Sequence, residues 1–168
     1  MTFRNIIDKA DSLFPNMFSL EEKMGWLNEL SALIYIDYIK NKKVLEKKPG
    51  ERIILPPGIT KERICSLFID GVKKEEPSSF DFLTASESEH VIIEYIDVPE
   101  ALIDENLPVS APYDNLFLYF LLAKICLHME DAEGYNNYMS LYNELFNDYK
   151  LLIGSGSGRR TFNFKNLW

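Results

Sequence analysis

The sequence predicts an α+β protein that is mainly α: a four-helix antiparallel bundle with a small inserted antiparallel β-sheet and a flexible C-terminal tail. Three observations lead to this fold class. Residues 116–129 are apolar at almost every position. Residues 135–152 carry apolar side chains at three- and four-residue steps, which is the pattern of one helix face. Upstream of both, short β-prone runs alternate with turn residues.

Length and composition suit one domain with a modest appendage. The chain has 168 residues, of which 46% are hydrophobic and 13% aromatic, enough for a packed core. We assign residues 1–45 and 108–153 to the helical bundle and residues 46–107 to the inserted β-rich region. Residues 154–168 form a flexible linker and C-terminal tail.

Two helices are expected before the insert. The first begins after Thr2, a fair N-cap, and ends before Pro15, because proline disrupts a helix interior. The second has a clearer start, since Ser19 and Glu22 match the S-x-x-E capping box. Its apolar stripe continues to about Lys40.

The apolar run at 116–129 predicts the central helix of the bundle. A helix apolar on nearly all sides must be surrounded by protein or lipid, and this one is too short and interrupted to cross a bilayer, which needs about 20 apolar residues. Pro112 is expected in its first turn. A polar break at 130–134 then leads into the helix at 135–152, so the two form an αα-hairpin.

Within the insert, four short runs are β-prone: residues 52–55, 64–71, 80–82 and 90–96. The second run ends in Asp-Gly, the strongest hairpin signal in the chain. Three or four such strands suffice for a small antiparallel sheet that packs on a helix.

Charge is unevenly distributed around the insert. Residues 40–48 hold five lysines, whereas residues 75–105 hold ten acids and neither lysine nor arginine. Both stretches can be solvated surface, and residues 40–48 are then a helix end and loop. Alternatively, they pair between subunits of a head-to-tail ring. The candidate inter-subunit residues are Lys42, Lys43, Lys47, Lys48, Glu87 and Glu89.

The tail differs from the rest of the acidic chain. A Gly-Ser linker at 154–158 precedes ten residues with three basic side chains and no acid. Such an end is either disordered or adds as a strand to a neighbour's sheet edge, since its apolar and polar residues alternate. The candidate partner-binding residues are Arg159, Arg160, Phe162, Phe164, Leu167 and Trp168.

Motifs for catalysis and cofactors are missing from the sequence. His90 and His128 have no flanking nucleophile pattern, and neither metal-ligand spacing nor a phosphate-binding loop occurs. We therefore expect no enzyme, no cofactor and no metal. Cys65 and Cys126 are expected to be reduced, and neither a signal peptide nor a membrane span is visible. A net charge of −8 argues against sequence-independent nucleic-acid binding.

Five sequence motifs lie near the two ends of the chain and consist of packing and turn patterns. They are DSLFPN (11–16), EKMGWLNEL (22–30), PVSAPYD (108–114), LYFLLA (118–123) and GYNNYMSLYN (134–143). Through these motifs, roughly half of the chain resembles a prophage protein family of Gram-positive hosts, which is similar to the head–tail connector (adaptor) proteins of long-tailed phages.

The resemblance implies a structural virion protein. Such a protein docks as a ring on the portal, binds the next neck or tail-completion protein, and lets DNA pass through an acidic lumen without sequence-specific contact. It implies location in the virion, and in the host cytoplasm during assembly, with no membrane partner. The acidic insert and aromatic tail depart from the family pattern, which leaves the partner of each surface open. The alternative is a non-catalytic soluble binding or assembly-chaperone module of a phage or prophage.

Overall fold

The computed structural model describes residues 1–51, 53–56, 58–60, 63–74 and 89–155. They form two units, which we name the helical unit and the sheet unit. The helical unit consists of Met1–Ser31 and the described residues from Glu100 onward, and the sheet unit is Ala32–Pro99. About half of the described residues are helical, and the mixed helix and sheet content predicted from the sequence is confirmed.

The two N-terminal helices begin where the capping signals predict. Helix α1 (Phe3–Leu13) starts at Thr2, whose hydroxyl accepts a hydrogen bond from Asn5 N while the Asn5 side chain accepts one from Thr2 N. Helix α2 (Leu20–Ile34) follows the Ser19–Glu22 capping box, with Ser19 N to Glu22 Oε2 at 2.7 Å and Glu22 N to Ser19 Oγ at 3.2 Å. Both predicted starts are confirmed.

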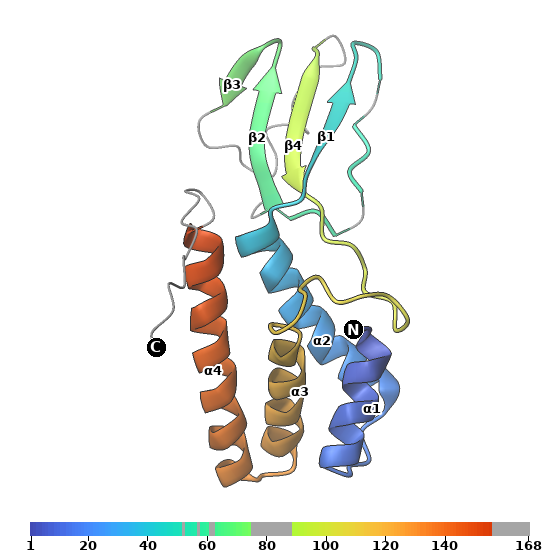
Figure 1. Cartoon of the computed structure of the whole chain (residues 1–168). Coiled ribbons are helices and arrows are strands. Elements are labelled where there is room, and N and C mark those ends of the chain that lie inside the picture. Colours follow the sequence, from blue (N-terminus) through green and yellow to red (C-terminus); the bar gives the residue numbers. More distant parts are fainter. Residues whose placement is uncertain (52, 57, 61–62, 75–88, 156–168) are drawn as a thin grey trace, which may run out of the picture. The chain divides into compact units, whose positions relative to one another are not determined.

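Helices α3 (Asn115–His128) and α4 (Ala132–Ser155) form the predicted αα-hairpin and lie side by side in opposite directions (Figure 1). The apolar sequence of α3 is explained by its surroundings, because eight of its residues are buried. Asp131 ends the short connection, and its carboxylate accepts a hydrogen bond from Gly134 N at 2.9 Å, as an N-cap residue does.

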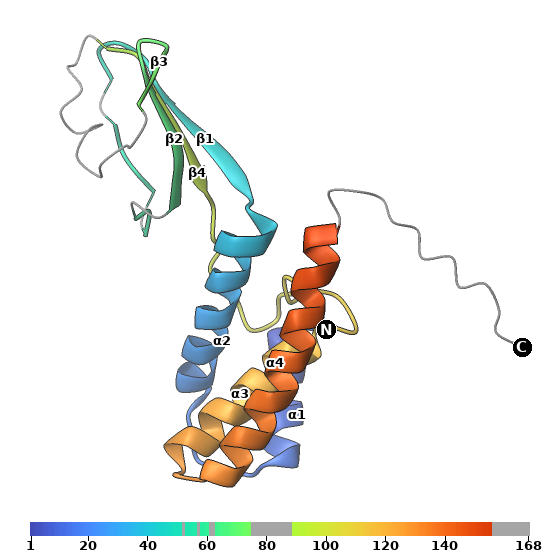
Figure 2. The ribbon, with the colours of Figure 1, turned by 90° about the vertical axis from the view of Figure 1, so that its left-hand side faces the viewer.

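Helix α3 also contacts both N-terminal helices. Phe3 of α1 meets Phe117 edge-on, with ring centroids 5.7 Å apart and planes at 86°. From α2, Glu29 forms an ion pair with Lys124 at 2.7 Å. The most deeply buried side chains of the helical unit come from α1, α2 and α3. Figure 2 shows from a second direction that α3 lies beside α4. Burying each large apolar side chain contributes about 1.5–3 kcal/mol.

The sheet unit contains four antiparallel strands in the order β1-β4-β2-β3 (Figure 1). They are β1 (Lys42–Lys47), β2 (Ile64–Ile69), β3 (Val72–Lys74) and β4 (Val91–Ile96). Leu67, Val91 and Ile93 form the core of this sheet on one face. Asp70 and Gly71 join β2 to β3 with positive φ values of 48° and 78°, as the Asp-Gly signal predicts for a two-residue hairpin turn.

Two predictions about the insert are wrong. Residues 42–47 are not a loop but strand β1, in which Leu45 pairs with Ile93 and packs against the sheet core. The described residues 53–55 are not a strand, and Ile53 and Leu55 instead lie against the same core. A proline follows at position 56, where the lack of an N–H donor disfavours a sheet ladder. Arg52 and the run at 80–82 lie outside the described residues.

The boundaries of the two units also differ from the predicted 46–107 insert. The sheet unit already includes β1 and the π-helical turn η1 (Tyr35–Ile39), which replaces the predicted last α-helical turn of the second helix. At the other end, residues after Pro99 belong to the helical unit because they bond to the start of α1. Arg4 N donates to Ile103 O at 2.8 Å, and Leu107 N donates to Met1 O at 3.0 Å.

Two further boundaries need correction. Pro112 precedes α3 instead of opening it, because residues 110–115 form tight turns in which Tyr113 N donates to Ser110 O at 2.9 Å. The linker predicted from Gly154 begins later, since α4 continues through Ser155. Residues 156–168 lie outside the described residues.

Candidate functional site

The first candidate surface is strand β1, which lies at one edge of the sheet. It pairs with β4 on one side only, so its outer side has no strand partner among the residues that the structure describes. Alternate side chains of a strand point to opposite faces. Lys43, Leu45 and Lys47 therefore share one face with the sheet core, and the other three side chains of β1 lie on the opposite face.

The lysines on the core side are already bonded within the chain. Lys43 Nζ lies 2.7 Å from Asp97 Oδ2, and this hydrogen bond together with the charge of Asp97 raises the pKa of Lys43. Lys47 is 5% exposed, and its Nζ donates to Glu89 O at 3.2 Å. Both ammonium groups thus stabilise the sheet unit itself.

The remaining predicted lysines, Lys42 and Lys48, are exposed. The backbone N of Lys48 donates to Glu51 Oε2 at 3.0 Å. The four lysines therefore do not form one continuous cationic patch, because two of them are held by their own sheet unit. Pairing of these lysines with an acidic neighbour stays a prediction. Lys42, Lys43 and Lys48 are exposed, and of these Lys43 already forms an ion pair with Asp97.

Of the predicted acidic and tail residues, the structure describes only Glu89. Glu89 lies beside Lys47, but the contact is made by its backbone carbonyl. A pair that the sequence reasoning missed is His90 Nε2 with Glu46 Oε1, at 2.8 Å. Glu87 and the six tail residues lie outside the described residues: Arg159, Arg160, Phe162, Phe164, Leu167 and Trp168.

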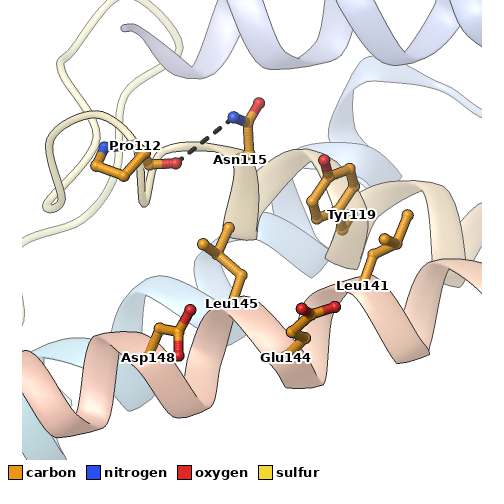
Figure 3. A pocket seen from close by; sticks show the side chains of 7 residues that line it. All are labelled: Pro112, Asn115, Tyr119, Leu141, Glu144, Leu145 and Asp148. Atoms are coloured by element: carbon orange, nitrogen blue, oxygen red, sulfur yellow. Dashed lines mark hydrogen bonds between the residues drawn. The ribbon is translucent and has the colours of Figure 1, made fainter. Parts of the chain in front are cut away.

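The second candidate surface is an open groove between α3 and α4, with a volume of about 230 Å³ (Figure 3). It lies entirely within the helical unit. Pro112, Asn115 and Tyr119 line one side, and the other side is formed by α4. The lining residues from α4 are Leu141, Glu144, Leu145 and Asp148.

The groove combines apolar side chains with negative charge. Glu144 and Asp148 are four residues apart on α4, one helical turn, and both are exposed. Neither forms an ion pair with another described residue. Leu145 lies between them in Figure 3, and Leu141 is 42% exposed. Asn115 closes one end, where its side-chain amide donates to Pro112 O at 3.5 Å (Figure 3).

The sequence does not predict this groove, because helical spacing puts Leu145 on the apolar face of the helix and Glu144 and Asp148 on its polar face. The signal on α4 was visible, since Leu141, Glu144, Leu145 and Asp148 recur at helical spacing. The wall formed by α3 could not be predicted from the sequence, because the position of Tyr119 opposite these α4 residues depends on how α3 and α4 are aligned.

Side chains that could bind a metal ion do not gather in the described part of the chain. There, no group of three or more His, Cys, Asp and Glu side chains is arranged to hold a metal ion. Both cysteines are free, and Cys126 is buried. Burial raises the pKa of the Cys126 thiol, and the nearby Asp131 carboxylate raises it further. Of the described helices, none is long and apolar enough to cross a membrane.

In comparisons with known proteins, the chain matches neither a model of a protein family nor a curated protein.

Proposed function

We propose that this chain is a structural virion protein, a head–tail connector (adaptor) that docks as a ring on the portal and links the capsid to the tail. One observation carries the proposal. The motif-bearing segments near the two ends of the sequence, which resemble connector proteins, fall almost wholly in the helical unit, whereas the residues between them form the separate sheet unit. A family scaffold that carries an insert is expected to divide in this way.

The scaffold of the proposed connector is a four-helix antiparallel bundle. The antiparallel α3–α4 hairpin and the contacts of α1 and α2 with α3 support this arrangement. In the proposed ring, subunits associate head to tail until the rotation closes. The exposed Lys42 and Lys48 are the charges available for an acidic neighbour. The tail residues supply the contacts to the portal and to the next neck or tail-completion protein.

The proposed role is mechanical and needs neither catalysis nor a cofactor. A chain with a net charge of −8 suits a channel through which DNA passes without sticking, because like charges repel. The proposed location is the virion, after assembly in the host cytoplasm, without a membrane partner. Recognition of the portal rests on complementary surfaces, to which the helical unit, the sheet unit and the tail all contribute.

Co-sedimentation with tailless capsids tests this function. The full chain is expected to sediment with portal-bearing capsids in a saturable manner, and a chain lacking residues 159–168 is expected to stay folded and to bind less. Capsid shells assembled without portal are the control for unspecific adhesion. Equal binding to shells with and without portal, or none to either, would refute the connector function. Co-purification with unassembled virion proteins alone would favour the assembly-chaperone alternative.

A further inference from the structure

The groove between α3 and α4 has the chemistry to receive an extended peptide that is both basic and aromatic. Its volume of about 230 Å³ lies below the range of roughly 300–1,000 Å³ that is usual for small-molecule sites. It suits one or two side chains of a peptide. The exposed carboxylates of Glu144 and Asp148 would attract cationic side chains, and Leu141 and Leu145 would pack against apolar ones.

The chain itself contains such a peptide. Residues 159–168 hold three basic side chains, four large apolar side chains and no acid. Side chains two residues apart lie on the same face of an extended segment, so one face of this peptide would carry a cation followed by two aromatic rings. The residues on that face are Arg160, Phe162 and Phe164.

The length of the intervening chain fits a return to the groove. Asp148 lies seven residues before Ser155, the last residue of α4, which is about 10 Å along the helix axis. Residues 156–158 are Gly-Ser-Gly and can span up to about 10 Å, with little steric resistance to a reversal. The basic pair at 159–160 can therefore reach Asp148. Each further pair of extended residues advances about 7 Å, which carries the aromatic side chains toward Leu145 and then Leu141.

Charge distinguishes this groove from the other candidate acceptor. Strand β1 carries the exposed Lys42, and like charges placed on adjacent strands destabilise their pairing. The groove presents two carboxylates instead. A short tether also gives the tail a millimolar effective concentration at a site on its own subunit.

From these observations we infer that, in the free subunit, the C-terminal tail docks into the α3–α4 groove of its own chain, with Arg160 beside Asp148 and Glu144. The docked tail covers the apolar groove and keeps its aromatic side chains out of water. This inference concerns the isolated protein, and it stands or falls independently of the connector function.

Tryptophan fluorescence of the full chain provides the test. In a Trp26→Phe/Trp168→Phe background, the Phe164→Trp substitution places the remaining tryptophan at the aromatic position that is expected beside Leu141. We expect it to be shielded from acrylamide, to the same extent at every protein concentration. The double variant Glu144→Gln/Asp148→Asn should weaken docking and increase quenching, with a roughly two- to ten-fold shift toward the undocked tail, as expected for two exposed ion pairs. Leu141→Lys should act in the same direction through charge repulsion.

The matched control is Asn143→Lys/Asn147→Lys, which changes the net charge of α4 by the same amount at exposed positions that do not line the groove. It should leave quenching unchanged. Full exposure of this tryptophan in the parent chain, or equal effects of both double variants, would overturn the inference. Shielding that appears only as the protein concentration rises would also overturn it, because the tail would then occupy a second copy. Capsid binding, measured separately, tests the connector function alone.

Discussion

The Trp26 indole of α2 and the His128 imidazole of α3 are stacked, with ring centroids 4.9 Å apart and planes inclined by only 12°. Phe18 approaches both rings edge-on, with centroids 5.2 Å from Trp26 and 5.9 Å from His128. This cluster joins the segment before α2 to the C-terminal end of α3. His128 therefore has a packing role, as expected for a histidine without a catalytic pattern around it.

The stacked pair predicts a measurable coupling energy. Aromatic pairs contribute about 0.5–1.5 kcal/mol beyond their buried area. In a double-mutant cycle with Trp26→Ala and His128→Ala, urea unfolding should give a coupling of this size. The pair Trp26→Ala and Lys124→Ala is the control, because Lys124 bonds to Glu29 and not to the ring cluster. Additive effects of the first pair would show that the stacking is energetically unimportant.

Removal of the α2 N-cap should destabilise the helical unit. The Ser19→Ala variant loses the hydroxyl that accepts from Glu22 N, which typically costs about 1 kcal/mol. Thermal or urea unfolding measures the difference from wild type. Ser12→Ala, at an exposed position inside α1, should change stability much less. Equal losses for the two variants would contradict a capping role for Ser19.

The same cap predicts a pH dependence. Hydrogen bonds from the Ser19 backbone N and then from its hydroxyl hold the pKa of Glu22 below its usual value. A carboxyl group with a lowered folded-state pKa contributes stability above its unfolded-state pKa of about 4.3, and this contribution is lost as the pH falls through the folded-state pKa. The advantage of wild type over Glu22→Gln should therefore shrink between about pH 6 and pH 3. A constant difference would indicate that the charge of Glu22 is not involved.

Gly134 is predicted to tolerate no side chain. A Cβ at this position would lie 2.8 Å from Sγ of Cys126, which is buried in α3, and still closer to the Asp131 carboxylate, which is hydrogen-bonded to Gly134 N. Gly134→Ala should destabilise the protein by about 1–3 kcal/mol, as overpacking usually does. The control is Gly25→Ala, where a Cβ meets nothing within 4 Å and the better helix propensity of alanine should stabilise α2. Chemical denaturation of both variants measures the contrast.

The Cys126 thiol should react slowly in the folded protein. It is fully buried, and its raised pKa keeps the nucleophilic thiolate scarce near neutral pH. Mass spectrometry after brief iodoacetamide treatment should find Cys126 unmodified in buffer and modified in urea. Cys65 is only partly buried and serves as the internal reference. Rapid labelling of Cys126 in buffer would mean that the α3–α4 hairpin opens readily.

Local signals explain which elements could be predicted from sequence. Thr2 and Ser19 mark helix starts because their hydroxyl groups accept hydrogen bonds from the backbone N–H three residues later. The Asp-Gly turn at 70–71 likewise depends only on residues within a four-residue segment. The burial of α3 can also be predicted locally, because its continuous apolar run lies within the helix itself. Strand β1 was missed because its lysines resemble a solvated loop, and its strand character depends on pairing with β4, more than forty residues away. The groove depends likewise on the alignment of α3 with α4.

The outer side of β1 has no strand partner among the described residues, and such an edge is a hazard because any extended chain can hydrogen-bond to it and seed aggregation. Three of its six residues are lysines, and one of these, Lys47, points inward and is bonded there. A foreign strand would have to lie alongside this positive charge. Replacing Lys42 with threonine would thus be expected to leave the sheet intact and make the purified protein less soluble.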